Sequence, residues 1–208
     1  YDAVNFLKDY VNYDDNILQE LYRQNKNILL EGAQGTGLDI TSENYPNVTS
    51  SSPSVGGAII SSGLNHNQID EVIGVIKAYK TKVGSGNFMS RCNDEDEKVL
   101  AFYGKEFGAT TGRPRKCGWL DLDEVNEAIK RNGVTHICLT KTDVFTNINE
   151  PCIYADNSLH NISKINDVTL NDESFINLLK IIKVKTGINN ISYTTGPNRG
   201  QIKWDVEI

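Results

Sequence analysis

A loop over residues 109–116 holds the densest binding chemistry in the sequence. It reads Ala-Thr-Thr-Gly-Arg-Pro-Arg-Lys and places two guanidinium groups, an ammonium group and two hydroxyls beside a glycine. Guanidinium groups bind carboxylate or phosphate oxygens through paired hydrogen bonds, and glycine lets backbone N–H groups approach the anion. Because the chain carries a net charge of −6, this basic loop stands out and predicts a site for small carboxylates or phosphates. A solvated basic turn is the alternative.

A second candidate site is the sequence Thr-Lys-Thr-Asp at 140–143, directly after a hydrophobic run at 134–139. The Asp143 carboxylate can accept hydrogen bonds from the N1–H and the 2-amino group of guanine, and the stem of Lys141 can lie along the base. Ligands in α/β folds bind at the carboxyl ends of strands, which favours this position. The motif therefore predicts recognition of guanine. A small GTPase-like switch protein would also need a G-x-x-x-x-G-K-[ST] loop, which the sequence lacks.

The third candidate is the pair Gln34 and Thr49. Gln34 lies in a glycine-rich loop at 32–37, and Thr49 lies in a Ser/Thr/Gly/Asn stretch at 41–63. An amide and a hydroxyl with nearby backbone donors can bind a base edge or a phosphate. Apolar residues at 58–60 interrupt the stretch. We therefore expect an ordered loop facing a ligand rather than a flexible linker.

The elements that must position these loops alternate between helix and strand. Periodicity predicts helices over 1–25, 68–72, 94–107, 122–132 and 172–185, and strands over 27–31, 73–83, 134–139 and 188–193. Gly133 predicts the end of the fourth helix. Strands that alternate with helices and end in polar, glycine-bearing loops indicate an α/β fold with a largely parallel central sheet flanked by helices. We expect residues 1–208 to form part of a single domain.

Composition narrows the class of protein. The 208 residues are 38% hydrophobic and 23% charged, and the net charge is −6. These values fit a globular protein and argue against a basic nucleic-acid coat. No apolar run is long enough to span a bilayer, so we expect neither a membrane nor a nucleic-acid partner. The only methionine is Met89 and the first residue is Tyr1, which leads us to expect a segment of a longer protein.

The metal-binding and nucleophilic residue types show no recognisable spacing. None of the four cysteines forms a C-x-x-C pair, so we expect reduced, mostly buried thiols in an intracellular protein. The three histidines lack metal-ligand spacing, and the sequence shows no Ser-His-Asp signature. We expect no metal ligands and no catalytic residues within this segment.

Short motifs in a fixed order resemble the middle and C-terminal part of the adenylosuccinate synthetase family. Among them are Gly-Ala-Gln-Gly-Thr at 32–36, Glu-Phe-Gly-Ala-Thr-Thr-Gly-Arg at 106–113 and Leu-Thr-Lys-Thr-Asp at 139–143. Further matches lie at 45–51, 56–57, 77–84, 118–121 and 195–197. The resemblance implies a P-loop-NTPase-like synthetase fold, incomplete at the N-terminus. Two segments depart from the family pattern: residues 113–116, where the family has a run of arginines, and residues 86–91.

The resemblance also implies a reaction. GTP phosphorylates the 6-oxygen of IMP, and the amine of L-aspartate displaces the phosphate to give adenylosuccinate. Matching positions would bind IMP (Gln34, Thr49, Arg113), aspartate (Val83, Thr110, Thr111, Arg113, Arg115) and GTP (Arg115, Lys141, Thr142, Asp143, Thr194, Thr195, Gly196). The family's catalytic aspartate, phosphate-binding loop and general-acid histidine would precede this segment, which alone would bind ligands without turnover.

The resemblance further implies Mg²⁺ bound with GTP, a homodimer and a cytoplasmic location. Two alternatives stay open. One is a viral branch of the family that joins L-aspartate to dGMP. The other is a non-catalytic nucleotide-binding fragment. Lys141 and Asp143 favour GTP as the energy source, because adenine offers a carboxylate no matching pair of donors.

Overall fold

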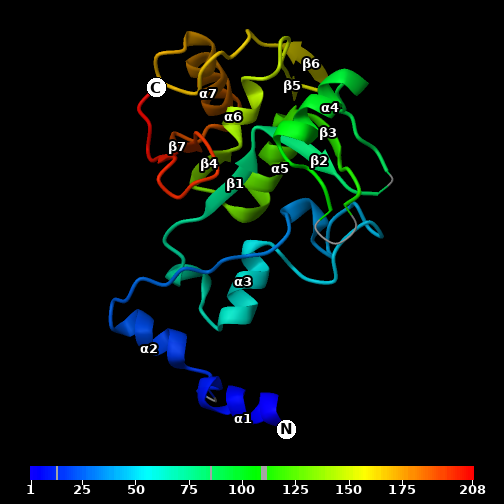
Figure 1. Cartoon of the computed structure of the whole chain (residues 1–208). Helices are drawn as coiled ribbons and strands as arrows, with labels where there is room; N and C mark the ends of the chain where they lie inside the picture. The colour runs from blue at the N-terminus through cyan, green and yellow to red at the C-terminus, as the bar shows by residue number, and fades with distance from the viewer. Residues whose placement is uncertain (13, 85, 109–111) are drawn as a thin grey trace. The chain divides into compact units, whose positions relative to one another are not determined.

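A computed structural model describes residues 1–12, 14–84, 86–108 and 112–208. The chain forms two compact units, residues 1–70 and residues 71–208, with the strands of Figure 1 all in the second unit. No helix among the described residues is long and apolar enough to cross a membrane. That the two units belong to a single domain stays a prediction.

The first unit is a set of short helices and turns. It contains α1 (Asp2–Leu7), α2 (Ile17–Arg23), α3 (Val55–Ser62) and 3-10 turns at Lys8–Tyr10, Thr36–Leu38 and His66–Gln68. The helical prediction for 1–25 is confirmed as two separate helices. The predicted strand at 27–31 is wrong, since these residues pair with no strand in the described part of the chain and Leu29 is 84% exposed. The predicted helix at 68–72 is also wrong, because the 3-10 turn ends at Gln68.

The first unit has little apolar core. Among its described residues only Leu64 is a buried hydrophobic side chain. The apolar patch at 58–60 belongs to α3, and Ile60 is 85% exposed. Polar contacts in the glycine-rich and serine-rich segments therefore contribute much of the order of this unit.

Two four-stranded sheets form the second unit. One has the order β1 (Ile73–Lys77), β4 (His136–Thr140), β7 (Asn190–Thr194), β8 (Ile202–Lys203); the first three are parallel and β8 is antiparallel. The other has the order β2 (Tyr79–Lys82), β3 (Lys116–Asp121), β5 (Cys152–Ala155), β6 (Ser158–Asn161), with a parallel pair in the middle and antiparallel pairs outside. The α/β class is confirmed, with the strands divided between two mixed sheets.

The strand predicted over 73–83 takes part in both sheets. It is interrupted at Ala78, which is fully buried and whose N–H donates to the carbonyl of Thr140. Residues before Ala78 pair with β4, and residues after it pair with β3. The carboxyl end of β1 therefore lies where the chain passes from one sheet to the other.

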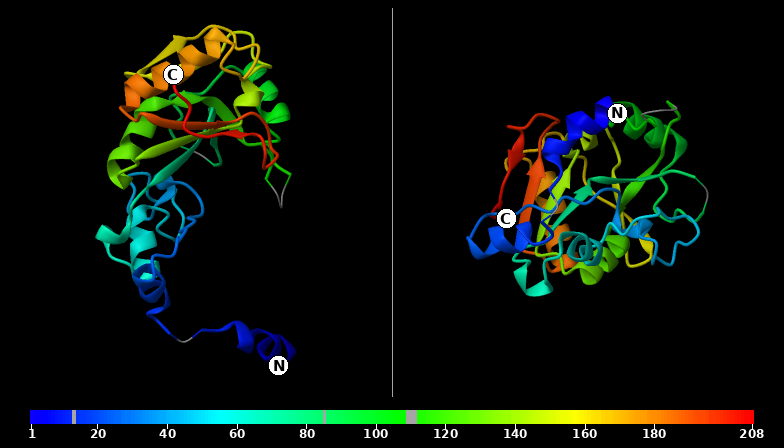
Figure 2. Two further views of the ribbon diagram at one scale, coloured as in Figure 1. Left: turned by 90° about the vertical axis from the view of Figure 1, so that its left-hand side faces the viewer. Right: turned by 90° about the horizontal axis from the view of Figure 1, so that it is seen from below.

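The described residues of the second unit include four helices: α4 (Asp94–Tyr103), α5 (Leu122–Asn132), α6 (Thr142–Phe145) and α7 (Glu173–Thr186). Figure 2 shows α7, in orange, along one face of the first sheet, and the rings of Phe175 and Tyr193 meet edge to face there with centroids 4.8 Å apart. The predicted end of α5 is confirmed, since Gly133 adopts the left-handed conformation with φ of 63°.

Buried polar and sulfur groups complete this unit. All four cysteines are free, and burial raises the pKa of Cys92 to about 12 and that of Cys117 to about 11. The structure also brings Ser192, His136 and Asp205 into contact, an arrangement that the sequence order does not reveal. The Ser192 hydroxyl is fully buried and accepts the N–H of Asp205 at 3.0 Å, so this group attaches the C-terminal segment to the sheet.

Candidate functional site

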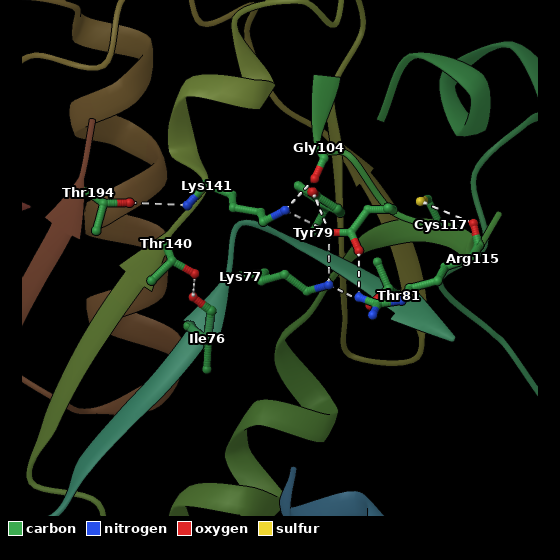
Figure 3. Close-up of polar contacts among 11 residues, drawn as sticks. Ile76, Lys77, Tyr79, Thr81, Gly104, Arg115, Cys117, Thr140, Lys141 and Thr194 are labelled. Atoms are coloured by element: carbon green, nitrogen blue, oxygen red, sulfur yellow. Dashed lines mark hydrogen bonds and ion pairs between the residues drawn. The ribbon is translucent and has the colours of Figure 1, made fainter. Parts of the chain in front are cut away.

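Three parallel strands end at one edge of the first sheet and bring polar side chains together. Lys77 is the last residue of β1, Lys141 directly follows β4, and Thr194 is the last residue of β7 (Figure 3). The backbone N–H of Lys141 donates to the Thr194 hydroxyl at 3.2 Å. The Thr142 hydroxyl donates to the Thr194 carbonyl. Side chains from three different parts of the chain therefore share one site.

A buried carboxylate, Glu106, organises this edge. It follows α4 and is only 1% exposed. One of its oxygens accepts hydrogen bonds from the Tyr79 hydroxyl at 2.7 Å and from the Lys77 and Lys141 ammonium groups at 3.1 Å each. The other oxygen accepts a bond from the Arg115 guanidinium at 3.0 Å. We call these three cations and their carboxylate the Glu106 cluster; the side chains around it are drawn in Figure 3.

Charge and burial oppose each other in the Glu106 cluster. Burial raises the pKa of Glu106, but the hydrogen bond from Tyr79, the charge of Lys77 and the hydrogen bonds from Lys141 and Lys77 outweigh it, and the pKa falls to about 2. The pKa of Lys77 is lowered, chiefly by burial and in part by the charges of Lys141 and Arg115, although Glu106 raises it. Burial also raises the pKa of Tyr79. The carboxylate is ionised at neutral pH, so three cations face a single anion.

The structure brings some of the predicted residues together and leaves others apart. Arg115 and Lys141, taken from different candidate loops, meet on Glu106. Arg113 lies on the exposed surface of the same loop as Arg115, and Val83 is 77% exposed. Thr110 and Thr111 lie outside the described residues.

The predicted guanine-binding residues lie beside the Glu106 cluster. Asp143 is in the first turn of α6 and is half-buried, and its carboxylate makes no hydrogen bond or ion pair within the described part of the chain. Thr195 donates its N–H to the Gln201 carbonyl at 2.8 Å. A Cβ added at Gly196 would come within 2.6 Å of the Gln201 side chain, so a larger residue at this position would clash with Gln201.

The remaining predicted residues belong to the first unit. Gln34 has a positive φ of 62°, and its side-chain oxygen accepts a bond from the Ser51 hydroxyl at 3.4 Å. The Thr49 hydroxyl lies 3.5 Å from the same Ser51 hydroxyl. Gln34 and Thr49 therefore lie close to the same side chain, Ser51. A joint site requires such proximity.

A second buried carboxylate supports this part of the first unit. Asp39 is fully buried, and it accepts hydrogen bonds from the Ser52 and Thr41 hydroxyls at 2.6 Å each. These bonds lower its pKa. Asp39 thus holds together the loop in which Thr49 lies. The sequence analysis assigned it no role.

Sequence reasoning missed Lys77, Tyr79 and Glu106 as parts of the site. All three lie in segments that resemble the family, 77–84 and 106–113, but no residue type or spacing assigned them a role. Their role depends on contacts between residues 27 to 35 positions apart in the sequence, and these contacts become visible only in the folded structure.

The described residues show no group of three or more His, Cys, Asp or Glu side chains that could hold a metal ion. Glu106 already accepts four hydrogen bonds, three of them from cations. A carboxylate surrounded in this way is a poor ligand for Mg²⁺. The described part of the chain therefore does not fit a protein-held magnesium site.

An α/β fold with a basic cluster at the carboxyl ends of parallel strands is typical of proteins that bind small anionic ligands. The profile of the family described as adenylosuccinate synthetase matches residues 1–187. The chain belongs to the adenylosuccinate synthetase family.

Two curated relatives illustrate the similarity. The chain is 53% identical over 131 residues to an adenylosuccinate synthetase of Syntrophobacter fumaroxidans, which covers 63% of this chain and 30% of that protein. It is 47% identical over 151 residues to one of Chlorobium luteolum, covering 72% of this chain and 35% of that protein. The chain thus spans about a third of the length of the curated relatives it matches.

Two solved structures share the fold. One is a fully ligated adenylosuccinate synthetase from Plasmodium falciparum, with a TM-score of 0.85 and 28% identity over 94% of this chain and 54% of that chain. The other is a succinoaminodeoxyadenylate synthetase of cyanophage S-2L bound to dGMP and dATP. It gives a TM-score of 0.63 and 18% identity, and it covers 92% of this chain and 50% of that chain. The second likeness shows the fold alone.

Proposed function

We propose that the protein containing this chain is a ligase of purine nucleotide biosynthesis that joins L-aspartate to IMP at the expense of GTP, through a 6-phosphoryl-IMP intermediate. The observation that carries the proposal is the family match over residues 1–187. The basic cluster at the strand ends supports it, because the three substrates carry carboxylate or phosphate groups that guanidinium and ammonium groups bind.

GTP binding is assigned to the carboxyl ends of β4 and β7. Asp143 accepts hydrogen bonds from the N1–H and the 2-amino group of the guanine base. The aliphatic stem of Lys141 lies along the base, while its ammonium group stays in the Glu106 cluster. Thr142, Thr194, Thr195 and Gly196 complete this side of the site. The absence of other bonds to the Asp143 carboxylate within the described residues supports the proposal, because the group is left available to a ligand.

Aspartate and IMP are assigned to the remaining candidates. Arg113 and Arg115 bind carboxylate or phosphate oxygens, and Arg115 also reaches the triphosphate. Val83, Thr110 and Thr111 complete the aspartate site. Gln34 and Thr49 contact IMP together with Arg113. The contact of Gln34 and Thr49 with the same Ser51 hydroxyl supports their joint assignment.

The proposal also includes Mg²⁺ bound together with GTP, a homodimeric protein and a cytoplasmic location. The metal would reach the site with the triphosphate, because the described residues offer no ligand set of their own. It would neutralise the charge on the phosphate oxygens. Within this chain the Glu106 cluster would hold oxyanions in place, and Asp143 would orient the base.

A product assay on the intact gene product tests the proposal. One tube contains L-aspartate, Mg²⁺, IMP and GTP, and a second contains L-aspartate, Mg²⁺, dGMP and ATP; products are identified by mass. A succinyl adduct of IMP in the first tube supports the proposal. An adduct of dGMP alone would replace it with the viral reaction, and no adduct in either tube would leave only a nucleotide-binding role.

A further inference from the structure

The Glu106 cluster contains more positive charge than its own carboxylate balances. Lys77, Lys141 and Arg115 each lie within 3.1 Å of a Glu106 oxygen. One carboxylate compensates one of these three charges. The side chains of all three cations remain 28% to 39% exposed, so positive charge that Glu106 does not balance can meet a ligand from solvent.

Each cation also keeps hydrogen-bond donors for such a ligand. Lys77 uses one N–H on Thr81 and one on Glu106, and Lys141 uses one on the Gly104 carbonyl and one on Glu106. An ammonium group has three N–H donors and a guanidinium group has five. Within the described residues, one donor on each lysine and several on Arg115 remain for an oxyanion.

Without Glu106 these cations would repel one another. Lys77 and Lys141 lie at the ends of neighbouring strands, because Lys77 pairs in register with Thr140, the residue before Lys141. Ammonium groups at the ends of neighbouring strands repel each other and move apart when they can. A fully buried carboxylate between them holds the groups in one place before any ligand arrives, which lowers the cost of ordering them on binding.

We propose that Glu106 is a positioning residue that holds Lys77, Lys141 and Arg115 as one preassembled oxyanion site, and that Lys77 binds the oxyanion directly. This inference rests on the proposed function for its substrates. The oxyanion is either the carboxylate of aspartate or the phosphate chain of GTP. Lys77 belongs to neither the loop at 109–116 nor the sequence at 140–143. It adds the end of β1 to a binding site already assigned to the ends of β4 and β7.

Three variants of the intact protein test the proposal by steady-state kinetics. Glu106→Gln keeps the shape of the side chain and removes its charge; we expect the KM for GTP and the KM for aspartate each to rise about tenfold or more. The KM for IMP should change less than about threefold, because its proposed ligands lie mainly elsewhere. Lys77→Met should raise the KM of whichever substrate provides the oxyanion, and Lys77→Arg should restore part of it.

A matched control is Asp121→Asn. Asp121 is also a buried carboxylate of the second unit, where it binds Lys80 at 3.0 Å and caps α5. If Glu106 were merely structural, both carboxylate-to-amide variants would alter all three KM values alike, and that result would overturn the proposal. Unchanged KM values for both GTP and aspartate in Lys77→Met would also overturn it.

A measurement independent of activity separates this proposal from the proposed function. Lysines are labelled by reductive methylation with ¹³C-formaldehyde, assigned with Lys77→Arg and Lys141→Arg, and titrated by NMR. In Glu106→Gln the pKa of Lys77 should fall further, because burial and the neighbouring cations remain while the carboxylate charge is lost. An unchanged titration refutes the positioning role even in an active enzyme. If the intact protein forms no adenylosuccinate, the proposed function fails and the titration still decides the role of Glu106.

Discussion

Replacement of Glu106 by Gln should remove a pH-dependent contribution to the stability of the fold, one that is present at neutral pH and lost in acid. The folded protein lowers the pKa of this carboxyl group from its ordinary value of 4.5 to about 2. A group with a lowered folded pKa stabilises the fold above the unfolded pKa, and this stabilisation is lost as the pH falls toward the folded pKa. The side chain is 1% exposed, so solvent screens the effect little.

The expected size follows from the two pKa values. The linked stabilisation is about 3 kcal/mol at pH 7, about half of that at pH 3 and only a small part of it at pH 2. The difference in unfolding free energy between wild type and Glu106→Gln should therefore shrink by most of this amount from pH 7 to pH 2.

Urea unfolding of the intact protein at several pH values measures this difference. The fluorescence of Trp119 reports on the second unit, since this residue is 3% exposed and packs against Phe145. Leu139→Ala is the control: Leu139 is fully buried and has no titrating group, so its loss should be the same at every pH. If the Glu106→Gln curve ran parallel to wild type, as the control should, the assignment of a strongly lowered pKa would be refuted.

Three further predictions concern single side chains. Asp143→Asn should raise the KM for GTP by about tenfold or more, because an amide replaces one acceptor of the guanine donors with a donor; unchanged GTP kinetics would contradict the base-reading role. Arg113→Ala should raise the KM for aspartate by about tenfold or more through loss of a charge-assisted pair, and an unaltered KM would remove Arg113 from that site. Leu139→Ala should cost about 2 to 5 kcal/mol of unfolding free energy, while Val75→Ala, at a side chain 69% exposed, should cost far less.

Local signals in the sequence predicted helices α4, α5 and α7 of the second unit, but not the short α6. Helix α5 begins after Asp121, whose side chain accepts the Glu124 N–H, and ends at the left-handed Gly133. Helix α7 begins after Asp172, which accepts two backbone N–H groups, and ends at Gly187. Caps are made by residues within a few positions of the helix end, so the sequence contains the whole of the information.

Strands depended on partners that the sequence does not identify. Residues 27–31 have the composition of a buried strand but no strand pairs with them in the described residues. The second sheet was missed because β5 and β6 are four residues each and pair mainly with one another and with β3. A strand is stable only with its neighbours, so short strands cannot be read from local periodicity alone.

The candidate site shows the same division between local and long-range information. Lys141 and Arg115 could be named because each lies in a loop with a recognisable pattern. Their meeting on Glu106 could not be predicted, because these bonds connect residues that are 35 and 9 positions apart in the sequence. Glu106 looked like an ordinary acidic residue after a helix; its burial gives it its role.

The position of Glu106 makes substrate binding and acid stability depend on one charge. If the carboxylate both stabilises the fold and assembles the cations, then a variant must change the two properties together. Glu106→Asp keeps the charge but shortens the side chain by one methylene, which weakens its bonds to cations on opposite sides of the cluster. We therefore expect intermediate values of both the acid-linked stabilisation and the KM for GTP and aspartate. A variant with wild-type acid stability and the binding defect of Glu106→Gln would separate the two roles, and the cations would then owe their arrangement to something other than this carboxylate.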